Sequence, residues 1–85
     1  MIVLDASVLA DALLDDGQVG AAARAALHID PHWVAPPHLL LEVISVIRGK
    51  TLGGKLSPAR ASDTIDVLPT LVIEEVPVYR LVNRI

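Results

Sequence analysis

The opening ten residues, Met1-Ile-Val-Leu-Asp-Ala-Ser-Val-Leu-Ala10, decide the predicted fold. An uninterrupted apolar run directly before Asp5 is typical of a short buried strand, and such strands are most common in parallel sheets. Ser7 is a favourable residue for capping the N-terminus of a helix. We therefore predict a strand that ends at Asp5, followed by a helix over residues 8–14.

The rest of the chain alternates helical and β-prone stretches. Apolar spacing and Ala content predict further helices, and short aliphatic runs bounded by Pro predict two more strands. The helices are expected at residues 18–27, 38–48, 58–68 and 78–85, and the strands at 32–35 and 71–73. Gly49 and the glycines after it are expected to end the third helix, and Ser57 to cap the fourth. This order predicts an α/β fold with a parallel sheet, whose ligands bind at the carboxyl ends of the strands.

Composition excludes several classes of protein. The chain has 85 residues, a formal charge of -3, 53% hydrophobic residues and no cysteine. The aliphatic content excludes disorder, and the absence of cysteine excludes disulfides and thiolate metal sites. The longest purely apolar runs are far shorter than the roughly 20 residues of a membrane span. No basic segment of a signal peptide precedes the first apolar run, so we expect a cytoplasmic protein.

Two carboxylates stand out as candidate functional groups. Asp5 follows the first strand, where α/β sheets place their ligands. Glu42 lies on the helix over residues 38–48, about 160° from the start of its apolar stripe at 100° per residue. That stripe consists of Leu40, Val43, Ile44 and Ile47. The structural alternatives are a helix-capping Asp and a solvated Glu, both of which are common.

These two acids could share a divalent metal ion. Mg²⁺ takes oxygen ligands and usually keeps several waters, so one carboxylate at a strand end and another on a facing helix could hold it. Ser7 could hydrogen-bond a carboxylate, a metal-bound water or a phosphate, or could simply cap the helix. The mild acidity gives no electrostatic footprint for duplex DNA. It leaves open a nucleic-acid enzyme that recruits metal cations.

The opening stretch and a second one, Pro36-Pro-His-Leu-Leu-Leu-Glu42-Val-Ile-Ser-Val-Ile-Arg48, together resemble PIN-domain proteins. The resemblance is greatest to the VapC toxin subunits of VapBC toxin–antitoxin pairs. It implies a three-layer α/β/α fold with a central parallel sheet and an endoribonuclease that uses Mg²⁺ or Mn²⁺. It also implies RNA as substrate, a cognate antitoxin that blocks the site, and a homodimer. By position, Asp5 and Glu42 would be the metal-binding acids, and Ser7 the small polar residue beside them.

The chain departs from this family toward its C-terminus. The family completes its acidic site with further aspartates, beginning in a Tyr-Asp-Ala segment, whereas Tyr79 is followed here by Arg80. We therefore interpret residues 1–85 as a single incomplete PIN-like domain whose C-terminal part is missing and which holds half of the acidic site. The apolar residues from Val78 onward should then be covered by other residues or by a partner. The alternative is a non-catalytic module for antitoxin binding or dimerisation.

Overall fold

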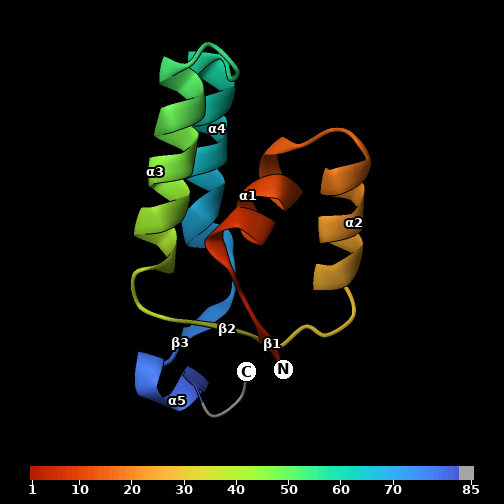
Figure 1. The fold of residues 1–85 in the computed structure, drawn as a ribbon, viewed down its shortest axis with the longest axis vertical. Coiled ribbons are helices and arrows are strands. Elements are labelled where there is room, and N and C mark those ends of the chain that lie inside the picture. The colour runs from red at the N-terminus through yellow and green to blue at the C-terminus, as the bar shows by residue number, and fades with distance from the viewer. Residues whose placement is uncertain (83–85) are drawn as a thin grey trace.

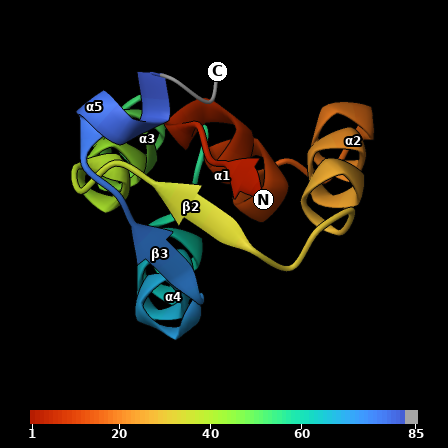
Figure 2. The ribbon, with the colours of Figure 1, turned by 90° about the horizontal axis from the view of Figure 1, so that it is seen from below.

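Three short strands form a parallel sheet in the computed structural model, which describes residues 1–82 (Figure 1). They are β1 (Ile2–Val3), β2 (Trp33–Ala35) and β3 (Ile73–Glu75). The strand order is β1-β2-β3, and both pairings are parallel. Figure 2 shows β2 between its two neighbours. The prediction of an α/β fold with a parallel sheet is confirmed at this level.

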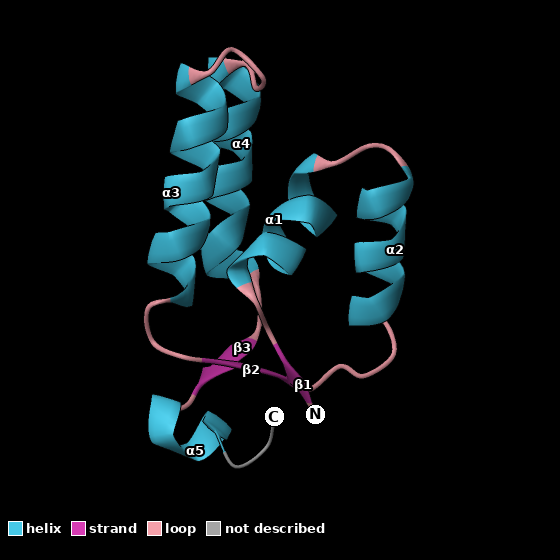
Figure 3. Cartoon of the chain, viewed as in Figure 1, coloured by secondary structure: helices cyan, strands magenta, loops and turns pink. Residues whose placement is uncertain are grey.

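The helices connect the strands and cover the sheet unevenly. In the described part of the chain they are α1 (Ala6–Leu14), α2 (Gln18–Leu27), α3 (Leu39–Leu52), α4 (Pro58–Val67), the 3₁₀ turn η1 (Leu68–Thr70) and α5 (Val78–Val82). The four longer helices lie on one side of the sheet, and the short α5 lies on the other (Figures 1 and 3). None of the helices within residues 1–82 is long and apolar enough to span a membrane.

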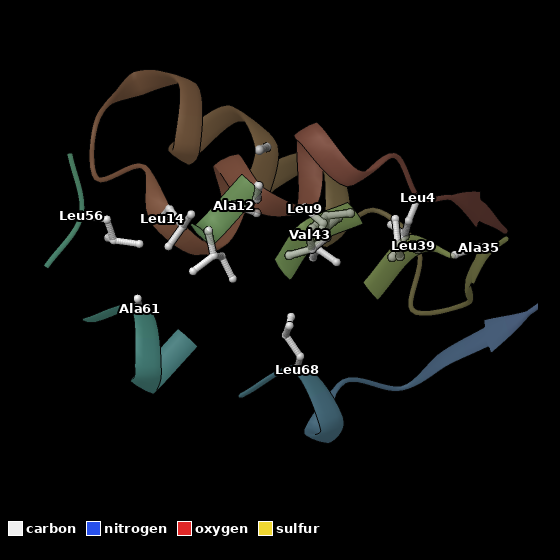
Figure 4. Packing of buried hydrophobic residues seen from close by; sticks show 14 residues of the cluster. Leu4, Leu9, Ala12, Leu14, Ala35, Leu39, Val43, Leu56, Ala61 and Leu68 are labelled. Carbon is white, nitrogen blue, oxygen red and sulfur yellow. The ribbon is translucent and has the colours of Figure 1, made fainter. Parts of the chain in front are cut away.

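The hydrophobic core lies between α1, α3 and the sheet. Leu9 and Val43 meet at its centre, while Leu4, Ala35 and Leu39 lie together at the end next to the strands (Figure 4). Leu9 and Val43 are almost fully buried. Burial of a side chain of this kind contributes roughly 1.5–3 kcal/mol. The core holds the start of α1 against the start of α3, and both candidate carboxylates lie near these helix ends.

The α1–α2 hairpin depends on one close approach. A Cβ added to Gly20 would lie 1.8 Å from the carbonyl oxygen of Asp15, so only glycine fits there. Arg24 donates to the carbonyl oxygens of Ala12 (3.0 Å) and Asp15 (2.8 Å), which ties α2 to the end of α1. The prediction of a helix over residues 18–27 is confirmed.

The first helix begins earlier than predicted. It starts at Ala6 because Asp5, and not Ser7, is its N-cap residue. The backbone of Asp5 is extended, and its side chain accepts from the N–H of Ser7, two residues on. The capping alternative for Asp5 is therefore correct, and the prediction that Ser7 caps the helix is wrong. In contrast, Ser57 caps α4 as predicted and accepts from the N–H of Arg60.

The third helix runs past its predicted end and turns a different face to the core. It continues through Gly49, which is exposed, and ends before Gly53. Its buried residues are Leu39, Val43 and Ile47, whereas Ile44 is 38% exposed. The predicted stripe was therefore rotated about the helix axis relative to the observed one.

Two further boundaries differ toward the C-terminus. The last strand comprises Ile73–Glu75 rather than residues 71–73, and it is only partly buried because it forms an edge of the sheet. The fourth helix ends at Val67, and Pro69 lies inside η1. The predicted helix over residues 78–85 is observed as α5, and its last three positions lie outside the described residues.

Candidate functional site

The junction between β1 and α1 places Asp5 at the carboxyl end of the sheet. The N–H of Leu4 donates to the carbonyl of Val34 (2.8 Å), so the chain is still held against β2 one residue before Asp5. The carbonyl oxygen of Asp5 then accepts from Leu9 (3.0 Å), the first backbone bond of α1. The Asp5 carboxylate is thus fixed between a strand and a helix while remaining exposed to solvent.

Two hydrogen bonds from Ser7 favour the ionised form of the Asp5 carboxylate. The Ser7 hydroxyl donates to Oδ1 of Asp5 at 2.6 Å, and its backbone N–H donates to the same oxygen at 2.7 Å. These two bonds, in that order, lower the pKa of Asp5 below its usual value against a small opposing effect of burial. The positive end of the α1 dipole favours the same charge. Asp5 is therefore an anion at neutral pH, with both bonds from Ser7 on one of its two oxygens.

The first turn of α3 carries the second carboxylate. The N–H of Glu42 donates to the carbonyl of His38 (3.1 Å) as the helix begins. Glu42 Oε1 lies 3.0 Å from His38 Nε2, one turn earlier on the same face. About half of each side chain is exposed, at 54% for Glu42 and 51% for His38. His38 is the N-cap residue of α3, and its side chain makes no capping bond.

A hollow of about 560 Å³ lies at the carboxyl ends of β1 and β2. Among the lining residues within the described chain, Asp5 and His38 have polar side chains and the others are apolar. The lining residues are Met1, Val3, Leu4, Asp5, Pro36, His38, Val78, Leu81 and Val82. The structure therefore brings Asp5 and His38 to one hollow, and connects Glu42 to that hollow through His38.

The predicted site residues lie in or near this hollow. Asp5 lines the hollow, and Ser7 hydrogen-bonds the Asp5 carboxylate, which was one of its predicted roles. Glu42 does not line the hollow but contacts His38, which does. The contact between His38 and Glu42 was not predicted from the sequence. The i, i+4 spacing of His38 and Glu42 on a helix that starts after two prolines was the available signal.

The structure does not gather a larger acidic cluster in the described residues. Within residues 1–82, no group of three or more His, Cys, Asp or Glu side chains is close enough together to hold a metal ion. The candidate site accordingly consists of Asp5 with its Ser7 donors and of the His38–Glu42 pair.

A second charged region has a structural role. At the far end of α1, Arg60 donates to both carboxylate oxygens of Asp16 (2.9 Å each) and to the carbonyl of Leu14 (2.8 Å). These bonds fasten α4 to the α1–α2 turn. The surrounding hollow holds three acidic and three basic side chains, so it favours neither cations nor anions. Its charged residues are Asp11, Asp15, Asp16, Lys50, Lys55 and Arg60.

Comparison with known proteins gave no match to a family model, a curated protein or a solved structure.

Proposed function

We propose that this chain is a metal-dependent endoribonuclease of the PIN-domain, VapC-like kind, with a three-layer α/β/α architecture. One observation carries the proposal: an ionised Asp5 lies at the carboxyl end of the parallel sheet, in a hollow that His38 also lines, and His38 Nε2 lies 3.0 Å from Oε1 of Glu42. The proposed activity is taken from the resemblance of the sequences around Asp5 and Glu42 to PIN domains. The cytoplasm is the expected location.

The donor set suits Mg²⁺ or Mn²⁺. Both candidate ligands are carboxylates, and hard divalent cations prefer oxygen ligands. Mg²⁺ is commonly bound through one or two carboxylates while water fills its remaining positions. Asp5 and Glu42 would hold the ion in this way. When bound, such an ion polarises phosphate oxygens and generates a nucleophilic water.

The residues of the chain prepare the site for a cation and a polyanion. Ser7 stabilises the negative charge of Asp5, and the sheet and α1 hold that charge in place. Its second carboxylate oxygen is the one that Ser7 does not contact. An RNA phosphodiester would lie in the hollow between Asp5 and His38, where its charge requires the cation because no Lys or Arg is among the described lining residues.

A second candidate function is non-catalytic binding of an antitoxin or of another copy of the chain. The observation that favours it is the apolar wall of the same hollow, in which Val78 and Val82 are 50% and 66% exposed. An apolar segment of a cognate antitoxin would pack against this wall and place a basic side chain against Asp5. We also propose that two copies of this chain form a homodimer.

The two functions separate in one set of measurements. Mn²⁺ titration followed by calorimetry, and cleavage of single-stranded RNA with Mn²⁺, should both succeed for the wild type, and EDTA and Glu42→Gln should abolish cleavage. Absence of Mn²⁺ binding, or binding unchanged by Asp5→Asn, would remove the nuclease proposal for this chain. Stoichiometric binding of an antitoxin without metal binding would favour the second candidate.

A further inference from the structure

We infer that the outer face of α3 is a dimerisation surface, against which a second copy of this chain packs its own α3 in the antiparallel direction. The outer face consists of Leu41, Ile44, Ser45, Arg48 and Leu52. This inference rests on the homodimer of the proposed function and names the surface that forms it. It does not depend on the metal site.

The outer face of α3 is a row of exposed side chains, most of them apolar. Leu41 and Leu52 are 68% and 78% exposed, and Ile44 lies between them. At 100° per residue, the five residues fall within about 100° of one another, on the side of the helix away from its buried residues. This side lies at the edge of the molecule (Figures 1 and 2). A single exposed Leu is ordinary, whereas an aligned row of apolar side chains is typical of an interaction surface.

The spacing of the outer face fits a pair of helices. Leu41, Ser45, Arg48 and Leu52 are separated by four, three and four residues, which is the spacing of a coiled-coil seam. The row is also symmetric about the midpoint between residues 46 and 47. In an antiparallel pair centred there, Leu41 faces Leu52 of the second copy, and Ser45 faces its Arg48. A two-fold interface requires self-complementarity of this kind.

Charge favours the antiparallel direction. Glu42 lies beside the outer face in the first turn of α3, and Arg48 lies on the face in the second half of the helix. Antiparallel packing turns each acidic end toward the basic half of the other helix, and opposed helix dipoles stabilise the same arrangement. The Ser45 hydroxyl donates to the carbonyl of Leu41 (3.0 Å), so its oxygen can still accept from Arg48 of the second copy. Parallel packing would instead place the two Arg48 side chains against each other.

The size of the outer face sets the expected strength of the dimer. A helix of 14 residues is about 21 Å long. A single pair of such helices lies at the low end of specific interfaces, below about 1,200 Å² of buried surface. We therefore expect a reversible dimer with a dissociation constant between about 1 µM and 1 mM.

The test is sedimentation equilibrium of the full chain at concentrations up to about 1 mM. The wild type should approach twice the monomer mass. Leu41→Glu should weaken the dimer by about tenfold or more, because a carboxylate would face Leu52 at both ends of the pair. Ile29→Glu is a matched control, since Ile29 is 82% exposed but lies outside the outer face, and it should leave the dissociation constant unchanged. Circular dichroism should show that all variants are folded, because each substituted side chain is exposed.

A charge swap tests the direction of the pair. Positions 41 and 52 are about 16 Å apart along one helix, too far to form an ion pair within it. Leu41→Glu combined with Leu52→Lys brings opposite charges together only in the antiparallel dimer, so it should recover most of the lost affinity. Leu41→Glu combined with Leu52→Glu should remain monomeric.

Three outcomes would overturn the inference: a wild type that is monomeric throughout, an unchanged dimer in Leu41→Glu, or no recovery in the charge swap. Calorimetric titration of the same samples with MnCl₂ is a separate readout. A dimer that binds no Mn²⁺ would contradict the proposed nuclease and leave the dimerisation surface in place. A monomer that binds Mn²⁺ would contradict the surface and leave the nuclease in place.

Discussion

Substitution of Asp5 by Asn and by Ala separates its observed role, capping α1, from its proposed role, binding metal. The Asp5 side chain accepts the N–H of Ser7 at the start of a helix that has no acidic residue in its first turn. Asn can accept the same bond and is as good an N-cap residue as Asp, whereas Ala cannot accept it. Asn therefore removes the charge and keeps the cap, and Ala removes both.

The structure sets the size of each effect. Loss of an N-cap side chain costs about 1 kcal/mol, and loss of a negative charge at a helix N-terminus about 0.5 kcal/mol. Asp5→Ala should therefore lower the free energy of unfolding by about 1.5 kcal/mol and Asp5→Asn by about 0.5 kcal/mol. For a chain of this length, these values correspond to decreases in Tm of roughly 6–12 °C and 2–4 °C.

Mn²⁺ affinity should depend on the negative charge of residue 5 and not on its capping bond. Both variants should lose Mn²⁺ affinity by about tenfold or more, since each removes one of the two proposed carboxylate ligands. Ser57→Ala provides a matched control. It removes the cap of α4, where Ser57 accepts from Arg60 at 3.2 Å, so it should cost about 1 kcal/mol of stability and leave Mn²⁺ affinity unchanged.

Thermal unfolding and calorimetric Mn²⁺ titration of the three variants give both quantities. Asp5→Asn with wild-type Mn²⁺ affinity would show that Asp5 is only a helix cap and would refute the metal site. Asp5→Ala as stable as the wild type would refute the capping assignment. A loss of Mn²⁺ affinity in Ser57→Ala would show that the affinity reports general stability rather than coordination.

Three further predictions concern the fold. Gly20→Ala should unfold the α1–α2 hairpin or prevent it from forming, whereas Gly49→Ala, which meets no atom within 4 Å, should raise stability by about 0.5–1 kcal/mol in chemical denaturation. Ile47→Ala should cost about 2–5 kcal/mol because its side chain is 1% exposed, and Ile29→Ala, 82% exposed, should change stability by less than about 0.5 kcal/mol. The lowered pKa of Asp5 means that its contribution to stability is complete above the unfolded-state pKa, about 3.9, and is lost as the pH falls below it; an acid titration in which Asp5→Asn shows the same loss would contradict this.

Local signals were sufficient for much of the fold. The apolar run before Asp5 predicted the end of a strand, and the Ser57-Pro58 pair predicted the start of a helix. Both boundaries were observed. The order of helices and strands predicted the parallel sheet. These features require only backbone geometry and capping, which neighbouring residues determine.

Packing decided the features that the sequence did not predict. Asp and Ser rank alike as N-cap residues, so nothing local distinguished Asp5 from Ser7. Gly49 costs about 1 kcal/mol in a helix interior, and the buried Ile47 in the same turn offsets that cost, so α3 continues. It ends where Gly54 takes a φ of 73°, a left-handed conformation suited to glycine.

The rotation of α3 bears most directly on the candidate site. At 100° per residue, the predicted stripe placed Glu42 about 150–160° from the core direction, at the back of the helix. With Leu39 buried in place of Ile44, the core direction passes through Val43, and Glu42 lies only about 100° from it. The packing thus turns Glu42 from the back of the helix to its flank. Glu42 contacts His38, one turn earlier on the same helix face, and His38 lines the Asp5 hollow.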